Sequence, residues 1–215
     1  MDIFQSYYQA ADTDKAVGMS AYMKNQFAFL GLQKPARASL SRSFLAQKKK
    51  EAAVDWDFIC RCFEMPEREF QYIAIDYLIA VKGRLQANDL GRIETLIITK
   101  SWWDTVDLLA GVAGDIIMRH DETKDEFAAK WMQSDNLWLR RVSILFQLKY
   151  KEKTDTAFLS RAILKNGDTK EFFLNKAIGW ALREYSKTDA EWVRGFISTH
   201  SLNALSVREA SKYLY

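Results

Sequence analysis

The sequence predicts an all-α protein built as a solenoid of stacked, antiparallel helical hairpins of the HEAT type. Only two prolines and nine glycines interrupt the 215 residues, apolar residues recur with helical spacing, and alternating β-branched runs are nearly absent. Short helices joined by short turns follow one another in pairs of about 30–40 residues, a rhythm typical of helical repeats. Because no residue motif recurs at a fixed period, a single compact bundle is the structural alternative.

Turn-forming residues separate the helices that this periodicity predicts. Glycine or proline marks the turns at residues 31–35 and 82–83, and polar clusters mark those at 134–136, 151–155, 165–169, 186–189 and 198–206. The expected helices are residues 2–11, 14–30, 35–48, 55–64, 67–81, 88–99, 102–119, 123–132, 136–149, 154–164, 170–185, 189–198 and 206–214.

Length and composition indicate one globular domain over residues 1–215, because no Pro- or Gly-rich linker divides the chain. Hydrophobic residues make up 48% and charged residues 27%, which is ordinary for a water-soluble protein. Neither a signal peptide nor an apolar run of about 18 residues is recognisable, so a cytoplasmic protein without a membrane partner is expected. The C-x-C pair Cys60 and Cys62 is predicted to be two small buried thiols rather than a disulfide or zinc site.

The heptapeptide Ser-Trp-Trp-Asp-Thr-Val-Asp at residues 101–107 is the most unusual stretch of the sequence. Ser101 is expected to cap a helix, with Asp104 three residues on as a variant of the capping box. On that helix, Trp103, Asp107, Gly111 and Gly114 share one stripe. Two helical glycines each cost about 1 kcal/mol relative to alanine, so something is expected to approach this face closely. The stripe therefore predicts one wall of a cleft; alternatively, Trp103 is core, Asp107 is solvated and the glycines admit a neighbouring helix.

Arg141 stands on the apolar stripe of the helix predicted at residues 136–149. A buried arginine needs an anionic partner, because an unpaired buried charge is costly. Asp107 is the partner that we expect, in either a functional site or a purely structural ion pair.

Lysine, arginine and tryptophan alternate along the helix predicted at residues 170–185 and just beyond it. Lys176, Trp180, Arg183 and Lys187 step by four, three and four residues, so a tryptophan lies within a basic stripe. Positive charge with an aromatic ring suits a nucleic-acid surface, whereas a solvated basic face with Trp180 in the core is the alternative. Residues 132–215 carry 14 Lys or Arg against 9 Asp or Glu, which also permits a polyanionic partner.

Other common kinds of site are not recognisable in the sequence. His120 and His200 have no neighbours with metal-ligand spacing and are predicted to lie on the surface, so no metal is expected. Phosphate-binding glycine loops, dinucleotide fingerprints and serine nucleophile elbows are not found, and no cofactor is expected.

Four stretches of the sequence together resemble the AlkD family of bacterial DNA alkylation repair glycosylases, which are built from HEAT-like repeats. They are Tyr-Met-Lys-Asn at 22–25 with Phe-Leu-Gly at 29–31, the heptapeptide at 101–107, Trp-Leu-Arg-Arg at 138–141 with Ile-Leu-Phe-Gln-Leu-Lys-Tyr at 144–150, and residues 176–185. They occur in family order over nearly the whole chain. Ala28 stands where the family commonly has proline, and residues 36–38 are less basic than usual.

The resemblance implies a right-curved solenoid whose concave face binds double-stranded DNA. It implies a base excision repair enzyme, acting as a monomer, that removes cationic N3- or N7-alkylated purines, such as 3-methyladenine and 7-methylguanine, without flipping the damaged nucleotide. By position, Asp107 resembles the catalytic carboxylate, Trp103 and Trp180 resemble aromatic walls around the deoxyribose, and Arg141 resembles the residue that orients the carboxylate beside DNA. The expected DNA-binding residues are Lys24, Arg140, Lys149, Lys176, Arg183 and Lys187.

The chemistry of an alkylated purine is consistent with this set of residues. Its positive charge lets the glycosidic bond break without a general acid, so only the oxocarbenium-like sugar and the water need stabilisation. Arg141 near Asp107 is expected to favour the ionised carboxylate. Two hypotheses of other classes remain: a non-catalytic protein that recognises damaged or branched DNA, and a protein-interaction scaffold.

Overall fold

The computed structural model describes residues 2–214, and within them the fold is all-α, as predicted. The part of the chain that the structure describes has no named strand, and an isolated bridge joins Ala28 to Glu67. None of its helices is long and apolar enough to cross a membrane. Contacts divide the chain into two compact units, residues 1–85 and 86–215, each described here by itself. The expectation of a single domain stays a prediction.

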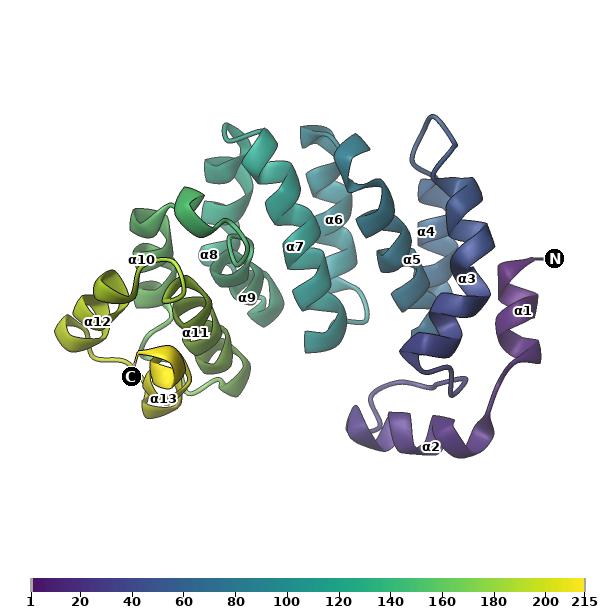
Figure 1. The fold of residues 1–215 in the computed structure, drawn as a ribbon, viewed down its shortest axis with the longest axis horizontal. Helices are drawn as coiled ribbons and strands as arrows, with labels where there is room; N and C mark the ends of the chain where they lie inside the picture. Colours follow the sequence, from purple (N-terminus) through teal and green to yellow (C-terminus); the bar gives the residue numbers. More distant parts are fainter. Residues whose placement is uncertain (1, 215) are drawn as a thin grey trace. The chain divides into compact units, whose positions relative to one another are not determined.

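Unit 1 contains five α-helices (Figure 1). They are α1 (Ile3–Gln9), α2 (Thr13–Tyr22), α3 (Lys34–Lys48), α4 (Trp56–Glu64) and α5 (Arg68–Val81), followed by the 3-10 turn η1 (Lys82–Arg84). Helix α4 pairs with α5, and α3 contacts both α1 and α5. Three of these helices begin at an aspartate, Asp2, Asp12 or Asp55, whose side chain accepts a hydrogen bond from the first turn. This packing of hairpin on hairpin is the pattern that the sequence predicted.

Unit 2 contains eight α-helices, and its odd-numbered helices form a contacting row from α7 to α13. They are η2 (Ala87–Asp89) with α6 (Leu90–Ile98), α7 (Trp103–Arg119), a π-helical turn (Asp125–Ala129) with α8 (Lys130–Met132), α9 (Leu137–Leu145), η4 (Lys151–Lys153), α10 (Thr156–Lys165), α11 (Phe172–Tyr185), α12 (Ala190–Thr199), and α13 (Ala204–Ala210) with η5 (Ser211–Tyr213). Helices α6, α8, α10 and α12 each contact a neighbour in that row. The row brings α7, α9 and α11 together, and these three helices carry the predicted site (Figure 1).

The helix predicted at residues 14–30 is too long, because α2 ends at Tyr22. Lys24 and Asn25 adopt left-handed backbone angles with φ of 58° and 55°, which a continuing right-handed helix does not allow. The segment that follows is held by a buried carboxylate instead. Glu69 accepts hydrogen bonds from the backbone N–H groups of residues 30, 31 and 32 at 3.0, 2.9 and 3.0 Å.

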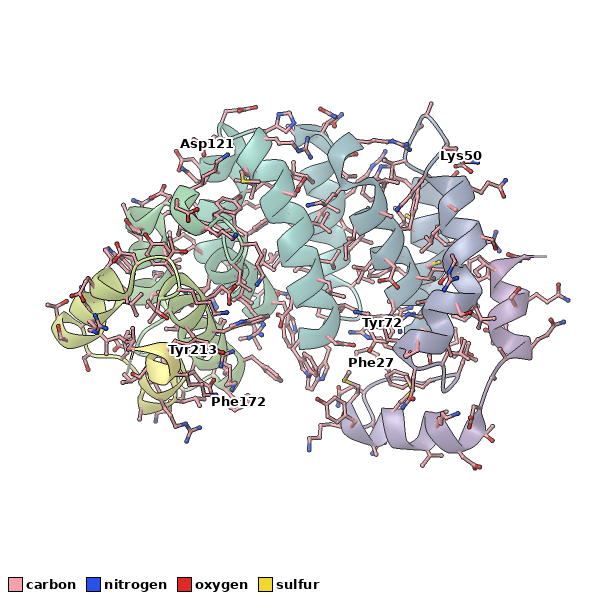
Figure 2. The ribbon with its side chains drawn as sticks, viewed as in Figure 1. Phe27, Lys50, Tyr72, Asp121, Phe172 and Tyr213 are labelled. Carbon is pink, nitrogen blue, oxygen red and sulfur yellow. The ribbon has the colours of Figure 1, made fainter. Side chains whose placement is uncertain are left out.

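A buried arginine fixes the same segment from its other side. The guanidinium of Arg68 lies 3.8 Å from the ring centroid of Phe27 and 5.9 Å from that of Tyr72, and both rings are labelled in Figure 2. The Arg68 side chain is fully buried, and its backbone N–H donates to the Ala28 carbonyl at 2.9 Å. Stacking on aromatic faces stabilises a guanidinium that has left water. The loop before α3 is therefore an ordered part of unit 1.

The structure exposes one cysteine that was expected to be buried, and it buries polar residues of the α9 region. Cys62 is buried as expected, but Cys60 is exposed. Ser143 and Gln147, both polar, are also buried. The Gln147 amide accepts from the backbone N–H of Asp155 at 2.8 Å and donates to its carbonyl at 3.3 Å, which satisfies its polar atoms away from water.

Candidate active site

The site is centred on an ion pair between Asp107 of α7 and Arg141 of α9. Arg141 Nε donates to one carboxylate oxygen at 2.7 Å, and Arg141 Nη2 donates to the other at 2.9 Å. Both side chains are largely buried, with 5% of Arg141 and 15% of Asp107 exposed. The predicted pairing is therefore confirmed, and the alternative of a solvated Asp107 is wrong. Two parallel hydrogen bonds fix the plane of the carboxylate as well as its position.

Burial raises the pKa of the Asp107 carboxyl above its usual range, while the hydrogen bonds and charge of Arg141 act in the opposite direction. The carboxylate of Asp104 also raises this pKa. Arg141 thus favours the ionised form as expected, but the loss of water around Asp107 outweighs it. Arg141 uses only part of the hydrogen-bonding capacity of this carboxylate, so its remaining lone pairs can accept hydrogen bonds from a bound ligand or water.

Arg141 also connects the pair to the third helix of the row. Its Nη1 donates to the backbone carbonyl of Phe173, in the first turn of α11. The guanidinium therefore contacts α7 through Asp107 and α11 through Phe173, so one side chain sets the spacing of three helices. The sequence did not predict the Phe173 carbonyl as a partner, because every residue has a backbone carbonyl and residue type does not show which one accepts a hydrogen bond.

Trp103 begins α7 one helical turn before Asp107, so the two side chains can share a face of that helix. Trp103 is half-buried rather than part of the core, which removes one of the alternatives left by its spacing. The predicted cap is wrong. The N-cap residue is Trp102, without a side-chain capping hydrogen bond, and the Ser101 hydroxyl donates instead to the carbonyl of Ile97, in the last turn of α6, at 2.6 Å.

An aromatic cluster borders this end of α7, α9 and α11. Trp102, Trp138 and Phe173 pack on one another with ring centroids 5.1–5.7 Å apart. All three are half-buried, and the neighbouring Phe172 is 58% exposed at the start of α11 (Figure 2). Trp102 therefore belongs to this half-buried cluster and not to the core.

The two glycines of α7 differ in their surroundings. A Cβ on Gly114 would lie 2.0 Å from the carbonyl oxygen of Phe146, whereas a Cβ on Gly111 would meet nothing within 4 Å. The Gly114 carbonyl also accepts a hydrogen bond from the Tyr150 hydroxyl at 2.5 Å. Gly114 thus admits the chain that leaves α9, as the alternative interpretation of the glycines proposed, and this close approach sets how α9 lies beside α7.

Trp180 lies on α11, is half-buried, and is flanked one turn away on each side by a cation. Lys176 and Arg183 both pair with the buried carboxylate of Glu209 on α13, each at 2.9 Å. Lys212 joins the same carboxylate at 2.8 Å. Trp180 has not turned into the core, which was the alternative interpretation. Within residues 2–214, however, no hydrogen bond joins Trp180 to Asp107.

Glu209 organises the basic stripe and was missed by the sequence. Hydrogen bonds from Lys212 and Lys176 lower its pKa to about 2, against the raising effect of desolvation. A Cβ on Gly179 would lie 2.5 Å from Glu209 Cβ, so the glycine allows α13 to approach α11 closely. The signal that could have found it is the spacing of Glu209 and Lys212, three residues apart on the last predicted helix.

The other predicted DNA-binding residues lie in different places. Lys149 and Lys187 share the carboxylate of Glu184 at 2.7 and 2.6 Å, beside the stripe on α11. Arg140 is half-buried, and its Nε has no hydrogen-bond partner within residues 2–214. Lys24 is exposed in unit 1, at the left-handed turn after α2. Unit 2 therefore contains every predicted site residue except Lys24.

The geometry defines a class of protein: helical hairpins that hold a buried carboxylate–guanidinium pair, a half-buried tryptophan one turn away and a paired basic stripe. Comparison with known proteins identifies the family within that class. The model of the DNA alkylation repair enzyme family matches residues 3–214, and the chain belongs to that family.

A solved structure from Enterococcus faecalis, described as a predicted DNA alkylation repair enzyme, is similar to this chain. The TM-score is 0.90 and the sequence identity 36%, and the match covers 95% of this chain and 96% of that one. No curated protein matches the chain.

Proposed function

We propose that this protein is a DNA glycosylase of the AlkD type, built from HEAT-like repeats. It hydrolyses the N-glycosidic bond of cationic N3- or N7-alkylated purines in double-stranded DNA. The observation that carries the proposal is the Asp107 carboxylate, held at 2.7 and 2.9 Å by Arg141 and placed one helical turn from Trp103. The family membership supports alkylated DNA as the substrate.

The chemistry needs one anion and a water molecule. The C1′–N bond of the alkylated nucleotide breaks, and its electron pair passes to the purine, which leaves neutral. The ionised Asp107 stabilises the positive charge that develops on the sugar and accepts a hydrogen bond from the attacking water. The water oxygen bonds to C1′, its proton passes to solvent, and the products are a free alkylated base and an abasic site. No general acid is required because the leaving group is already cationic.

Like the Asp107 carboxylate, the tryptophans stabilise positive charge on the sugar. The face of an indole ring is electron-rich and attracts a cation, including an oxocarbenium-like sugar. In the proposal Trp103 and Trp180 border the deoxyribose, and Arg141 positions Asp107 and contacts the backbone beside the lesion. The damaged nucleotide stays in the duplex, and Arg140, Lys149, Lys176, Arg183 and Lys187, with Lys24 from unit 1, bind phosphates.

The proposal is tested by base release from duplex DNA treated with a simple methylating agent. We expect the wild type to release 7-methylguanine or 3-methyladenine, and Asp107→Asn to be slower by roughly 100-fold or more, as for loss of a main electrostatic contribution in other enzymes. Asp115→Asn is the matched control, because Asp115 lies two turns further along α7 and pairs with Arg119 at 3.3 Å. This control should retain wild-type release.

Asp107→Asn also leaves the buried Arg141 guanidinium without an anion, which costs about 3–5 kcal/mol for a fully buried pair. Each rate of base release is therefore divided by the fraction of folded protein, which circular dichroism measures under the assay conditions. Wild-type rates in folded Asp107→Asn would contradict the assignment. Absence of release by the wild type, with duplex binding intact, would instead support a non-catalytic protein that recognises damaged or branched DNA.

A further inference from the structure

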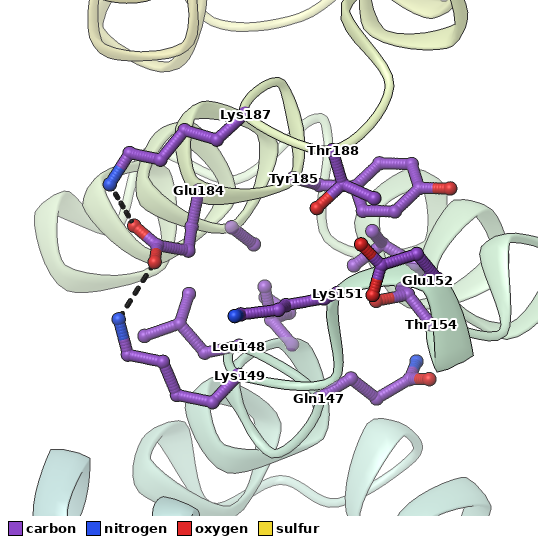
Figure 3. Close-up of a pocket in the computed structure, with 13 residues that line it drawn as sticks. Gln147, Leu148, Lys149, Lys151, Glu152, Thr154, Glu184, Tyr185, Lys187 and Thr188 are labelled. Atoms are coloured by element: carbon purple, nitrogen blue, oxygen red, sulfur yellow. Dashed lines mark hydrogen bonds and ion pairs between the residues drawn. The ribbon is translucent and has the colours of Figure 1, made fainter.

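A cavity of about 290 Å³ lies in unit 2, apart from the four proposed catalytic residues (Figure 3). The ends of α9 and α11 and the chain around η4 form it. Ile144, Leu148, Leu159 and Ala181 supply an apolar floor, and Tyr185 lines it as well. The rim carries Lys149, Lys151, Lys187, Glu152 and Glu184, with the hydroxyls of Thr154 and Thr188.

The charges of the rim are unequally satisfied. Glu184 pairs with both Lys149 and Lys187, which closes one edge of the cavity in Figure 3. Among the residues that the structure describes, the Lys151 ammonium has neither a hydrogen bond nor an ion pair, and Figure 3 shows this side chain reaching over the cavity. Three lysines and two glutamates leave one positive charge in excess, which matches the single negative charge of a phosphodiester.

The turn that carries Lys151 is held in place by its neighbours. Lys151 has a φ of 53°, a left-handed conformation in which lysine is less favourable than glycine or asparagine. Next to it, Gln147 is bound to both backbone groups of Asp155, so the turn that carries Lys151 is fixed at its base. The lysine is therefore presented by an ordered turn and not by a free loop.

We infer that this cavity is a subsite for one sugar–phosphate unit of the DNA backbone. In the subsite Lys151 binds the phosphodiester together with the pair of lysines held by Glu184. The apolar floor suits the carbon face of a deoxyribose, which a site for free phosphate would not require. The inference rests on the proposed action on DNA and extends it to a contact beyond the reacting nucleotide.

The test compares Lys151→Asn with Lys153→Asn by affinity for unmodified duplex DNA across a series of salt concentrations. Asparagine tolerates the left-handed conformation, so the first variant removes the ammonium while keeping the turn. Lys153 lies in the same 3-10 turn and is exposed, but it does not line the cavity, so its variant removes the same charge elsewhere. Thermal melting confirms that both variants fold.

We expect Lys151→Asn to weaken duplex binding by roughly 5- to 10-fold at low salt and to reduce the salt slope by about one, as for loss of one phosphate contact. Lys153→Asn should stay within about two-fold of the wild type. Equal effects of the two variants, or no effect of either, would overturn the subsite. Inorganic phosphate is a second arm: a Lys151-dependent thermal shift with phosphate, without Lys151-dependent duplex binding, would assign the cavity to free phosphate and also overturn it.

These outcomes are separate from those of the proposed glycosylase. Binding of unmodified DNA needs no base release, so the subsite can fail while alkylated bases are still released. Conversely, a wild type that binds duplex through Lys151 but releases no base would retain the subsite and lose the enzyme. A wild type that binds no duplex DNA would overturn both.

Discussion

At the scale of single residues, Asp107 combines two opposing requirements. In the proposed mechanism, its stabilisation of a cationic sugar strengthens as water is excluded, but exclusion of water also favours the protonated form, which carries no charge. Arg141 offsets that cost through two hydrogen bonds and its charge. In the proposed mechanism the arginine is thus a positioning residue, and its loss should alter the pH dependence of base release as well as the rate.

We predict that Arg141→Gln shifts the acid limb of the pH–rate profile for base release to higher pH. Release requires ionised Asp107, so activity rises as the pH increases through the pKa of this group. Burial already places that pKa above the ordinary value, and removal of the opposing guanidinium should raise it further. The acid limb is measured as the single-turnover rate of 7-methylguanine release at a series of pH values, corrected for spontaneous loss of the base.

Arg140→Gln is the control for this prediction, because Arg140 is adjacent in sequence but, within residues 2–214, makes no hydrogen bond to Asp107. It should weaken DNA binding and leave the acid limb in place. An unmoved limb in Arg141→Gln would mean that the arginine acts only by holding the helices together.

At the scale of helices, the sequence predicted which segments are helical much better than how those helices approach one another. Twelve or more residues of apolar periodicity identify α5, α7 and α11 directly. The two glycines of α7 looked alike in sequence, yet only Gly114 meets a neighbouring backbone. Whether a backbone approaches a glycine closely depends on residues distant along the chain, here those at the end of α9. The spacing of residues within α7 does not reveal them.

We predict opposite effects for alanine at these two glycines. Gly114→Ala places a methyl group against the Phe146 carbonyl, so it should destabilise the protein by about 1–3 kcal/mol and displace α9 with Arg141. Gly111→Ala meets open space and should stabilise α7 by up to about 1 kcal/mol. Chemical denaturation of both variants measures the difference, and base release reports the displacement. Similar stability of the two variants would show that α9 can move away without cost.

At the scale of the whole molecule, the sequence predicted the all-α class and the Asp107–Arg141 pair, because helical periodicity and an arginine on an apolar stripe are local signals. It failed where tertiary contacts decide the outcome. The segment after Tyr22 has helical composition but is held by Glu69 and by left-handed turns at Lys24 and Asn25. Likewise, the basic stripe was recognisable, but its pairing with Glu184 of α11 and Glu209 of α13 was not.

Those glutamates make the basic surface a compromise between stability and DNA binding. Lys149, Lys176, Arg183, Lys187 and Lys212 share the carboxylates of Glu184 and Glu209, so five cations are partly neutralised before any phosphate arrives. Glu209 is the more deeply buried of the two and has a pKa of about 2. Its charge therefore stabilises the folded protein at neutral pH and reduces the positive potential that attracts DNA.

Glu209→Gln should consequently change stability and binding in opposite directions. The lowered pKa means that the Glu209 carboxylate contributes stability fully above its ordinary value of 4.5, and that this contribution is lost as pH falls toward about 2. The wild type should therefore be more stable than the variant at neutral pH, with a gap that narrows below about pH 4.5. Duplex affinity at low salt should increase several-fold with a steeper salt dependence, because the net positive charge of the surface increases by one and the cations paired with Glu209 become available for phosphate. If affinity fell together with stability, Glu209 would be needed to orient Lys176 and Arg183 toward DNA, and the charge balance would be the lesser effect.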